Sequence, residues 1–294
     1  MAAAGHPLDL RGDGRVRRRR MVNRLMESLG TAAALLAVAV LAIVVFSVVR
    51  RGAGELSWGF LTGDLPTFAE AGGGIAPLIV GSALLVGIAT AIALPLGVLA
   101  ALYLTEFAPR KVARAIQLVI DLMNGLPSIV IAIFVFGLLV TGRGQSGYAG
   151  AVALSIVMFP LIARSTQEVL RLVPRSLREG ALALGASRWR TVLGVVLPQA
   201  LGGIVTGTVL AVARAAGETA PLLFATSIYA NTVQTDPRQA LPNIPVQIFI
   251  WSESPDPADH QRAWAAAVVL LGFVLLTSLA ARALLARSRR RLGR

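Results

Sequence analysis

Six long apolar runs dominate the chain and predict six membrane-spanning helices. They cover residues 31–49, 77–104, 116–140, 149–169, 191–223 and 263–281. Each run is close to or above the roughly 20 residues that a helix needs to cross the hydrocarbon core of a bilayer. The predicted fold class is therefore all-α, a polytopic membrane protein with six transmembrane helices.

Two of these runs carry residues that break helices. The run 116–140 contains the stretch Asn124-Gly125-Leu126-Pro127-Ser128. Irregular backbone at membrane depth is tolerated where it is buried or lines a cavity, so Asn124 and Ser128 are expected at a hinge or along a pathway. The run 191–223 is too long for one simple span, and we expect a break near Gly217.

Basic, polar segments flank the apolar part of the chain. Residues 1–30 form an arginine-rich tail before the first run, and residues 286–294 form a second one. A cleaved signal peptide is the competing interpretation of the start. The first run, however, is long, lacks a clear cleavage site and ends in two arginines, so 31–50 is interpreted as the first transmembrane helix.

Composition and charge support a membrane protein and give its orientation. Hydrophobic residues make up 55% of the chain and charged residues 15%, whereas soluble domains carry about a quarter charged residues. The net charge of +13 could indicate nucleic acid, but the basic residues cluster beside apolar runs. If the N-terminus is cytoplasmic, 22 of the basic residues lie in cytoplasmic segments and five lie outside. This distribution predicts a multi-pass protein of the bacterial cell membrane with both termini cytoplasmic. The predicted environment is membrane lipid, with no nucleic-acid partner.

The residues that usually hold metals or cofactors are scarce. The chain has no cysteine and two histidines, which lie far apart in a tail and in a loop. These facts exclude thiolate metal sites and iron–sulfur clusters, and the chain is expected to need no cofactor or metal.

Two connecting segments are too long to be simple links. Residues 170–190 are polar and helix-forming, and are expected in the cytoplasm. Residues 228–262 are proline-rich and expected outside, with Trp251 and Trp264 as anchors at the membrane interface.

The cytoplasmic segment carries a spaced motif. It reads Glu179-Gly180-Ala181, three residues, Gly185, nine residues, Val195, one residue, Leu197-Pro198. This resembles the EAA loop of ATP-binding-cassette (ABC) importer permeases and departs from it at Gly180 and Val195, by small changes of the same character. The resemblance implies a coupling helix that docks in an ATPase subunit; an ordinary amphipathic surface helix is the alternative.

The chain carries no nucleotide-binding loop of its own. No segment reads G-x-x-x-x-G-K-[ST], so ATP is not bound by a P-loop here. The chain is therefore not expected to be an enzyme, and its energy must come from another subunit.

An arginine and a glutamate lie inside the fifth apolar run. Arg214 and Glu218 are four residues apart, so they are expected on one helix face, with Thr219 next to them. Gly203, Gly207 and Ala211 form a ladder of small residues along that face, suited to close helix contact. Charges at this depth are costly and usually face protein or a wet pathway. Two interpretations stay open: a salt bridge that holds the bundle together, or an arginine that attracts a passing anion while Glu218 restrains it.

Arg164 is a second basic residue near the cytoplasmic end of a span. It follows Pro160 by four residues and has Ser165 and Thr166 beside it. A place along the pathway and snorkelling to the interface are both open.

Several further segments make the resemblance more specific. They are residues 73–82, 125–130, 175–179, 214–223 and 241–269. They are similar to the permeases of phosphate-specific ABC importers, and residues 244–248, 254–257 and 263–265 are closer to the A-type subunit than to its C-type partner. The similarity covers roughly residues 72–285, which would form the transporter domain with its coupling loop at 170–198.

The resemblance implies the partners and the cargo. They would be a second, C-type permease, a cytoplasmic dimer of ATP-binding subunits, an extracytoplasmic phosphate-binding protein, and phosphate itself or a related oxyanion. An autonomous channel or secondary transporter would also need polar groups and broken helices in the membrane, but would not need the loop 179–198. An intramembrane enzyme lacks support, because no paired acids or metal-ligand spacing appear in a span.

Overall fold

The computed structural model describes residues 14–66 and 72–291, and within these ranges the regular structure is helical, without strands. The all-α prediction is confirmed. The first 13 residues of the predicted N-terminal tail and the last three of the C-terminal tail lie outside the described residues. The chain divides into two compact units, residues 1–50 and 51–294, and each is considered by itself.

The first unit is essentially one helix. α1 (Gly14–Gly52) is 39 residues long and contains the whole apolar run 31–49. At 1.5 Å per residue it is about 58 Å long, roughly twice the hydrocarbon thickness of a bilayer. The helix begins earlier than the apolar pattern suggested, because the arginines and leucines before residue 31 are themselves good helix formers.

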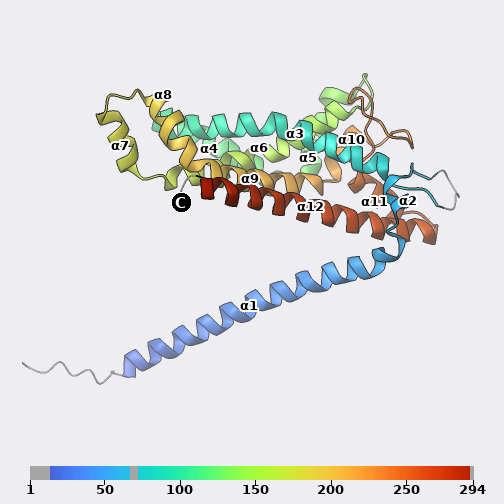
Figure 1. Ribbon diagram of the computed structural model, residues 1–294, viewed down its shortest axis with the longest axis horizontal. Helices are drawn as coiled ribbons and strands as arrows, with labels where there is room; N and C mark the ends of the chain where they lie inside the picture. The colour runs from blue at the N-terminus through green and yellow to red at the C-terminus, as the bar shows by residue number, and fades with distance from the viewer. Residues whose placement is uncertain (1–13, 67–71, 292–294) are drawn as a thin grey trace, which may run out of the picture. The chain divides into compact units, whose positions relative to one another are not determined.

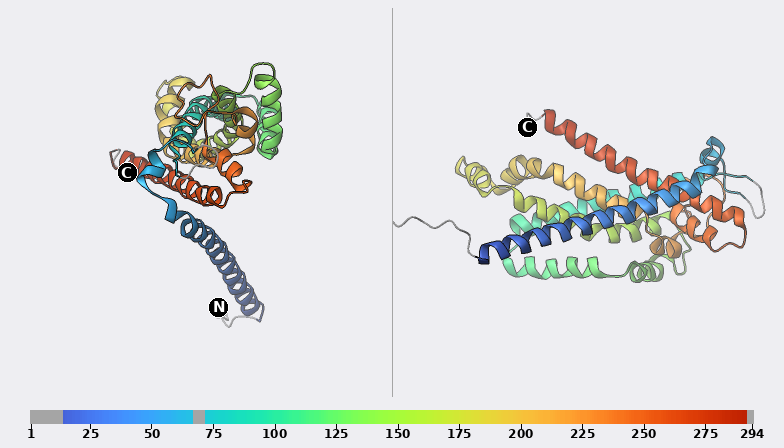
Figure 2. Two further views of the ribbon diagram at one scale, coloured as in Figure 1. Left: turned by 90° about the vertical axis from the view of Figure 1, so that its right-hand side faces the viewer. Right: turned by 90° about the horizontal axis from the view of Figure 1, so that it is seen from below.

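Three helices form the centre of the second unit. α3 (Ala76–Leu102), α6 (Gly147–Leu172) and α9 (Leu197–Ala216) pack side by side, as Figures 1 and 2 show. Small residues allow this close approach: a Cβ on Gly97 of α3 would lie 2.9 Å from the Ile162 side chain of α6. The long helix α12 (Pro257–Arg291) packs on α9 and α11.

The predicted third span is not straight. α4 (Arg110–Gly125) and α5 (Ser128–Val135) are bent by 99° relative to each other. The bend follows from Pro127, which lacks an N–H and disfavours helical backbone at the preceding residue; Leu126 is indeed extended, with φ −69° and ψ 132°. The break expected at 124–128 is confirmed. Among the described helices five are long and apolar enough to cross a membrane, or six if this bent pair counts as one span.

The predicted fifth span contains a π-helical turn near its start and is broken near its end. Helix α8 (Arg188–Thr191) leads through a π-helical turn, Val192–Val196, into α9, and α9 ends at Ala216. Residues 217–219 separate it from α10 (Ala220–Ala225), which packs against α5 and α6. The break near Gly217 is confirmed.

The two long connecting segments lie at opposite ends of the second unit. Figure 1 shows α7 (Arg175–Ala183) and α8 at one end, and α2 (Trp58–Thr62) and α11 (Ile244–Ser252) at the other. This separation agrees with the opposite sides predicted for residues 170–190 and 228–262.

The segment between α10 and α11 is held by side-chain hydrogen bonds. The Gln145 amide oxygen accepts bonds from the backbone N–H groups of Ser227 and Ile228, both at 2.7 Å. The buried Asn243 amide donates to the Thr226 carbonyl, and the Tyr229 hydroxyl donates to Gln247 at 2.9 Å. Burial raises the pKa of Tyr229, so this hydroxyl stays a neutral donor.

The prediction that Trp251 anchors the chain at the interface is wrong. Its side chain is buried in the cluster that contains Ile75, Leu78 and Ile244, so it does not reach a bilayer. Apolar packing inside the chain takes precedence over the interfacial preference of the indole ring.

Candidate functional site

Arg214 and Glu218 form an ion pair at the end of α9. The distance from Arg214 Nε to Glu218 Oε1 is 3.4 Å. The two residues do not share one uninterrupted helix, because α9 ends at Ala216 and Glu218 follows in the turn, where its N–H donates to the Ala215 carbonyl. The turn still brings the two side chains together. Thr219 comes next and is the N-cap residue of α10, without a capping bond from its own side chain.

The packing of the small-residue ladder against α6 gives the level of Arg214 along that span. A Cβ on Gly203 would collide with Val169 of α6, and one on Gly207 would collide with Ser165. These two contacts define an antiparallel register, and extending it by seven residues puts Arg214 level with Met158. Since α6 covers Gly147–Leu172, Arg214 lies near the middle of that span. The close helix contact predicted for Gly203 and Gly207 is confirmed.

The pair is unevenly exposed within the chain. The side chain of Arg214 is 56% exposed, whereas that of Glu218 is 15% exposed. A charged group at mid-span faces a protein neighbour or water rather than lipid, because burying it in hydrocarbon costs several kcal/mol. The exposed guanidinium group of Arg214 therefore requires either another protein chain or water next to it.

Arg164 belongs to a separate cluster closer to the α7 end of α6. Its Nη1 lies 3.5 Å from Asp121 Oδ1 on α4, and its Nε lies 3.5 Å from Glu168 Oε1. The Gln117 amide donates to the same Asp121 oxygen at 2.9 Å. Arg164 is six residues beyond Met158, which corresponds to about 9 Å along the helix. The predicted pathway arginines thus lie at two depths.

Asn124 and Ser128 lie on the two sides of the α4–α5 bend. Asn124 is one turn from Asp121, and its Nδ2 is buried without a hydrogen-bond partner in the described part of the chain. Ser128 is the first residue of α5, and its hydroxyl does not cap the helix. An unpaired buried amide is costly, so Asn124 is the polar group of this bend that most requires an additional partner.

The predicted coupling segment forms a compact two-helix turn, residues 175–191, called here the α7–α8 turn. Gly185 has φ +83°, its N–H donates to the Leu182 carbonyl, and the Ala186 N–H donates to the Ala181 carbonyl. These bonds define a Schellman motif, which ends α7 and favours glycine. A Cβ at Gly185 would meet nothing within 4 Å in this chain. The backbone alone therefore accounts for the glycine.

The α7–α8 turn exposes apolar side chains. The Leu184 side chain is 91% exposed, and Leu177, Leu182 and Trp189 are also exposed. Of the other predicted coupling residues, Glu179 and Gly180 are exposed, Ala181 is half-buried, and Pro198 lies exposed in the first turn of α9. Exposed leucines on a charged segment are typical of a protein-binding surface.

Sequence reasoning missed Glu106, which binds this turn. Arg178 Nη2 lies 2.8 Å from Glu106 Oε1, across 72 residues of sequence. The available signal was weak: Glu106 is an acidic residue beside the basic loop 110–114. The pairing of Asp121 with Arg164 was also missed.

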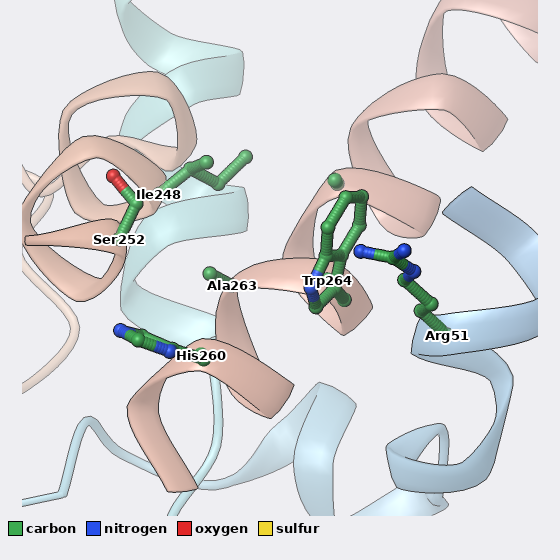
Figure 3. A pocket seen from close by; sticks show the side chains of 7 residues that line it. Arg51, Ile248, Ser252, His260, Ala263 and Trp264 are labelled. Carbon is green, nitrogen blue, oxygen red and sulfur yellow. The ribbon is translucent and has the colours of Figure 1, made fainter. Parts of the chain in front are cut away.

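A cavity of about 420 Å³ lies at the opposite end of the unit, between α11 and the start of α12. Arg51 stacks over the Trp264 ring at 4.8 Å. Figure 3 shows Arg51 on one side of that ring and His260 and Ser252 on the other. The polar groups do not converge, so this cavity lacks the geometry of an anion site.

Comparison with known proteins decides the family. Residues 93–290 match the family described as "Binding-protein-dependent transport system inner membrane component". The chain belongs to this family. It is 38% identical over 273 residues to the phosphate transport system permease protein PstA of Yersinia pestis, covering 92% of both chains. It is also 38% identical over 241 residues to the probable PstA of Methanocaldococcus jannaschii, covering 82% of this chain and 85% of the relative.

Solved structures of ABC transporter chains share the fold. A chain from the bacterial alginate ABC transporter, in complex with a pentasaccharide-bound periplasmic protein, superposes with a TM-score of 0.64 at 14% identity. The match covers 95% of this chain and 98% of that one. A chain of the inward-facing MetNI methionine ABC transporter matches with a TM-score of 0.57 at 20% identity, covering 72% and 93%. The fold is thus that of an ABC importer permease.

Proposed function

We propose that this chain is a permease subunit of an ATP-driven importer of inorganic phosphate, and that it lines the path of the ion. The observation that supports a role in lining the path is the position of Arg214. This arginine is half-exposed near mid-span, and its partner Glu218 is largely buried. The planar donor fork of arginine suits phosphate oxygens. The relatives named as phosphate transport permeases support the choice of cargo.

The two ends of the second unit support a proposed arrangement of the partners. The α7–α8 turn, with Leu184 exposed and Glu179, Gly180, Ala181, Gly185 and Pro198 around it, is proposed to dock in a cytoplasmic dimer of ATP-binding subunits. A second, C-type permease is proposed to complete the pathway beside Arg214, Arg164, Asn124, Ser128 and Thr219. The opposite end is proposed to receive an extracytoplasmic phosphate-binding protein.

Uptake by cells tests this function. Cells that lack their own A-type permease should regain uptake of radiolabelled phosphate under phosphate limitation when they express this chain together with its partner subunits. Excess unlabelled sulfate should leave the uptake unchanged, which separates phosphate from other oxyanions. Failure to restore uptake, with the complex assembled in the membrane, would contradict the proposal.

The proposed orientation has a separate test, because the chain contains no cysteine. Thr232 and Ala183 are exposed at opposite ends of the second unit and have no capping role. In intact cells Thr232→Cys should react with a membrane-impermeant maleimide, whereas Ala183→Cys should react only after permeabilisation, since basic residues mark the inside. The reverse pattern would invert the topology.

A further inference from the structure

Two neighbouring residues beyond the end of α3 hold the α7–α8 turn. Glu106 and Phe107 belong to the π-helical turn Tyr103–Phe107, which continues α3. Glu106 binds Arg178 of α7, and Phe107 contacts Trp189 of α8. One dipeptide therefore fixes both short helices of the turn.

The contact between Glu106 and Arg178 is bidentate and partly buried. Arg178 Nη2 donates to Glu106 Oε1 at 2.8 Å, and its Nε donates to Oε2 at 3.3 Å. The remaining donors reach the carbonyls of Leu170 at 2.8 Å and Val173 at 2.5 Å, at the end of α6. The Arg178 and Glu106 side chains are 20% and 12% exposed. Paired donors and acceptors of this kind fix orientation as well as distance.

The second contact is aromatic. The rings of Phe107 and Trp189 are stacked with centroids 4.4 Å apart, and the Arg188 guanidinium lies 5.9 Å from the centroid of the Phe107 ring. The stack and the ion pair attach to different helices of the turn, so together they resist rotation of the turn as well as its separation from α3.

The helix that carries this dipeptide spans the unit. α3 begins at Ala76. Close to this end, Gly81 approaches the carbonyl of Pro242 so closely that a Cβ would collide with it. It then packs along α6, with fewer contacts to α9, as far as the π-helical turn. A displacement of residues 106–107 therefore acts on a continuous helix that reaches the opposite end, next to the segment 226–243.

From these contacts we propose that Glu106–Arg178 and Phe107–Trp189 form a clasp that transmits movement of the α7–α8 turn to α3. Glu106 and Arg178 are then positioning residues that link ATP hydrolysis to the opening of the pathway. This inference rests on the proposed function. A purely stabilising pair would affect assembly instead of the ratio between hydrolysis and transport.

The test uses the complete complex, reconstituted in vesicles with its ATPase and phosphate-loaded binding protein. The variants are Glu106→Gln, which keeps the shape of the side chain, and Glu106→Gln/Arg178→Gln, which leaves no unpaired charge. Lys111→Gln, an exposed basic residue in the adjacent helix α4, is the matched control. Assembly, ATP hydrolysis and phosphate accumulation are measured on the same preparations.

Both clasp variants should assemble and hydrolyse ATP, but the ATP consumed per phosphate should rise at least about fivefold, the lower end of typical coupling between sites. The double variant should be no worse than the single one, because the two residues act as a unit. An unchanged ratio in either assembled variant, or loss of assembly in both, would overturn the clasp. Absence of ATP-driven transport in the unaltered complex would instead contradict the proposed function.

Discussion

Leu184→Asp should abolish ATP-driven phosphate uptake while the chain still inserts in the membrane. The Leu184 side chain is 91% exposed at the end of α7 and makes little contribution to the chain's own packing. Burying a leucine in a partner contributes about 2 kcal/mol, and placing a carboxylate in the same pocket adds a desolvation cost. Docking of the ATPase should therefore weaken by at least about thirtyfold.

The measurement is co-purification of the ATPase with the chain, followed by uptake. Leu184→Met keeps an apolar side chain of similar volume and is the matched control, with near-normal docking expected. Normal co-purification and uptake by Leu184→Asp would contradict the docking role of the α7–α8 turn.

The breaks in the helices were predictable because they depend on local chemistry. Pro127 removes a donor and constrains Leu126, and Gly217 ends α9 before Pro221 restarts a helix. The helical fold class was predictable from the apolar runs, because the length and hydrophobicity of each run are also local properties of the sequence. In contrast, the 99° angle between α4 and α5 depends on what each helix packs against, which the local sequence does not contain.

The partners of the charged residues were harder to predict. Arg164 pairs with Asp121 across 43 residues, and Arg178 pairs with Glu106 across 72 residues. Such pairs depend on which helix faces lie together, and a single sequence does not specify this. Gly185 shows a different case: the sequence identified it as a position of the motif, and the structure accounts for the glycine by a positive φ.

Removing both charges of the mid-span pair should separate ATP hydrolysis from transport. A unit charge about 6 Å from an anion, at an effective dielectric near 20, changes its energy by roughly 3 kcal/mol, or about a hundredfold in rate. Glu218 offsets part of this field, so we expect Arg214→Gln/Glu218→Gln to lower phosphate uptake by at least about tenfold. Arg214→Lys keeps the charge but loses the fork, and should retain part of the uptake.

The structural alternative predicts a different pattern for the same residues. If the pair only held the bundle together, Arg214→Gln alone would leave Glu218 largely buried and without its partner, and assembly would suffer most in that single variant. Removing both charges would then restore uptake. Lys111→Gln again serves as the control for loss of one exposed positive charge.

The central claim is that phosphate passes along this chain. The ratio of phosphate accumulated to ATP hydrolysed tests it most directly. Phosphate accumulated per ATP hydrolysed should be measured in vesicles containing the assembled Arg214→Gln/Glu218→Gln complex and, in parallel, the unaltered complex. The account predicts continued hydrolysis with phosphate accumulation reduced by about tenfold or more. Accumulation and hydrolysis equal to those of the unaltered complex would contradict it and would leave Arg214 and Glu218 with a structural role alone.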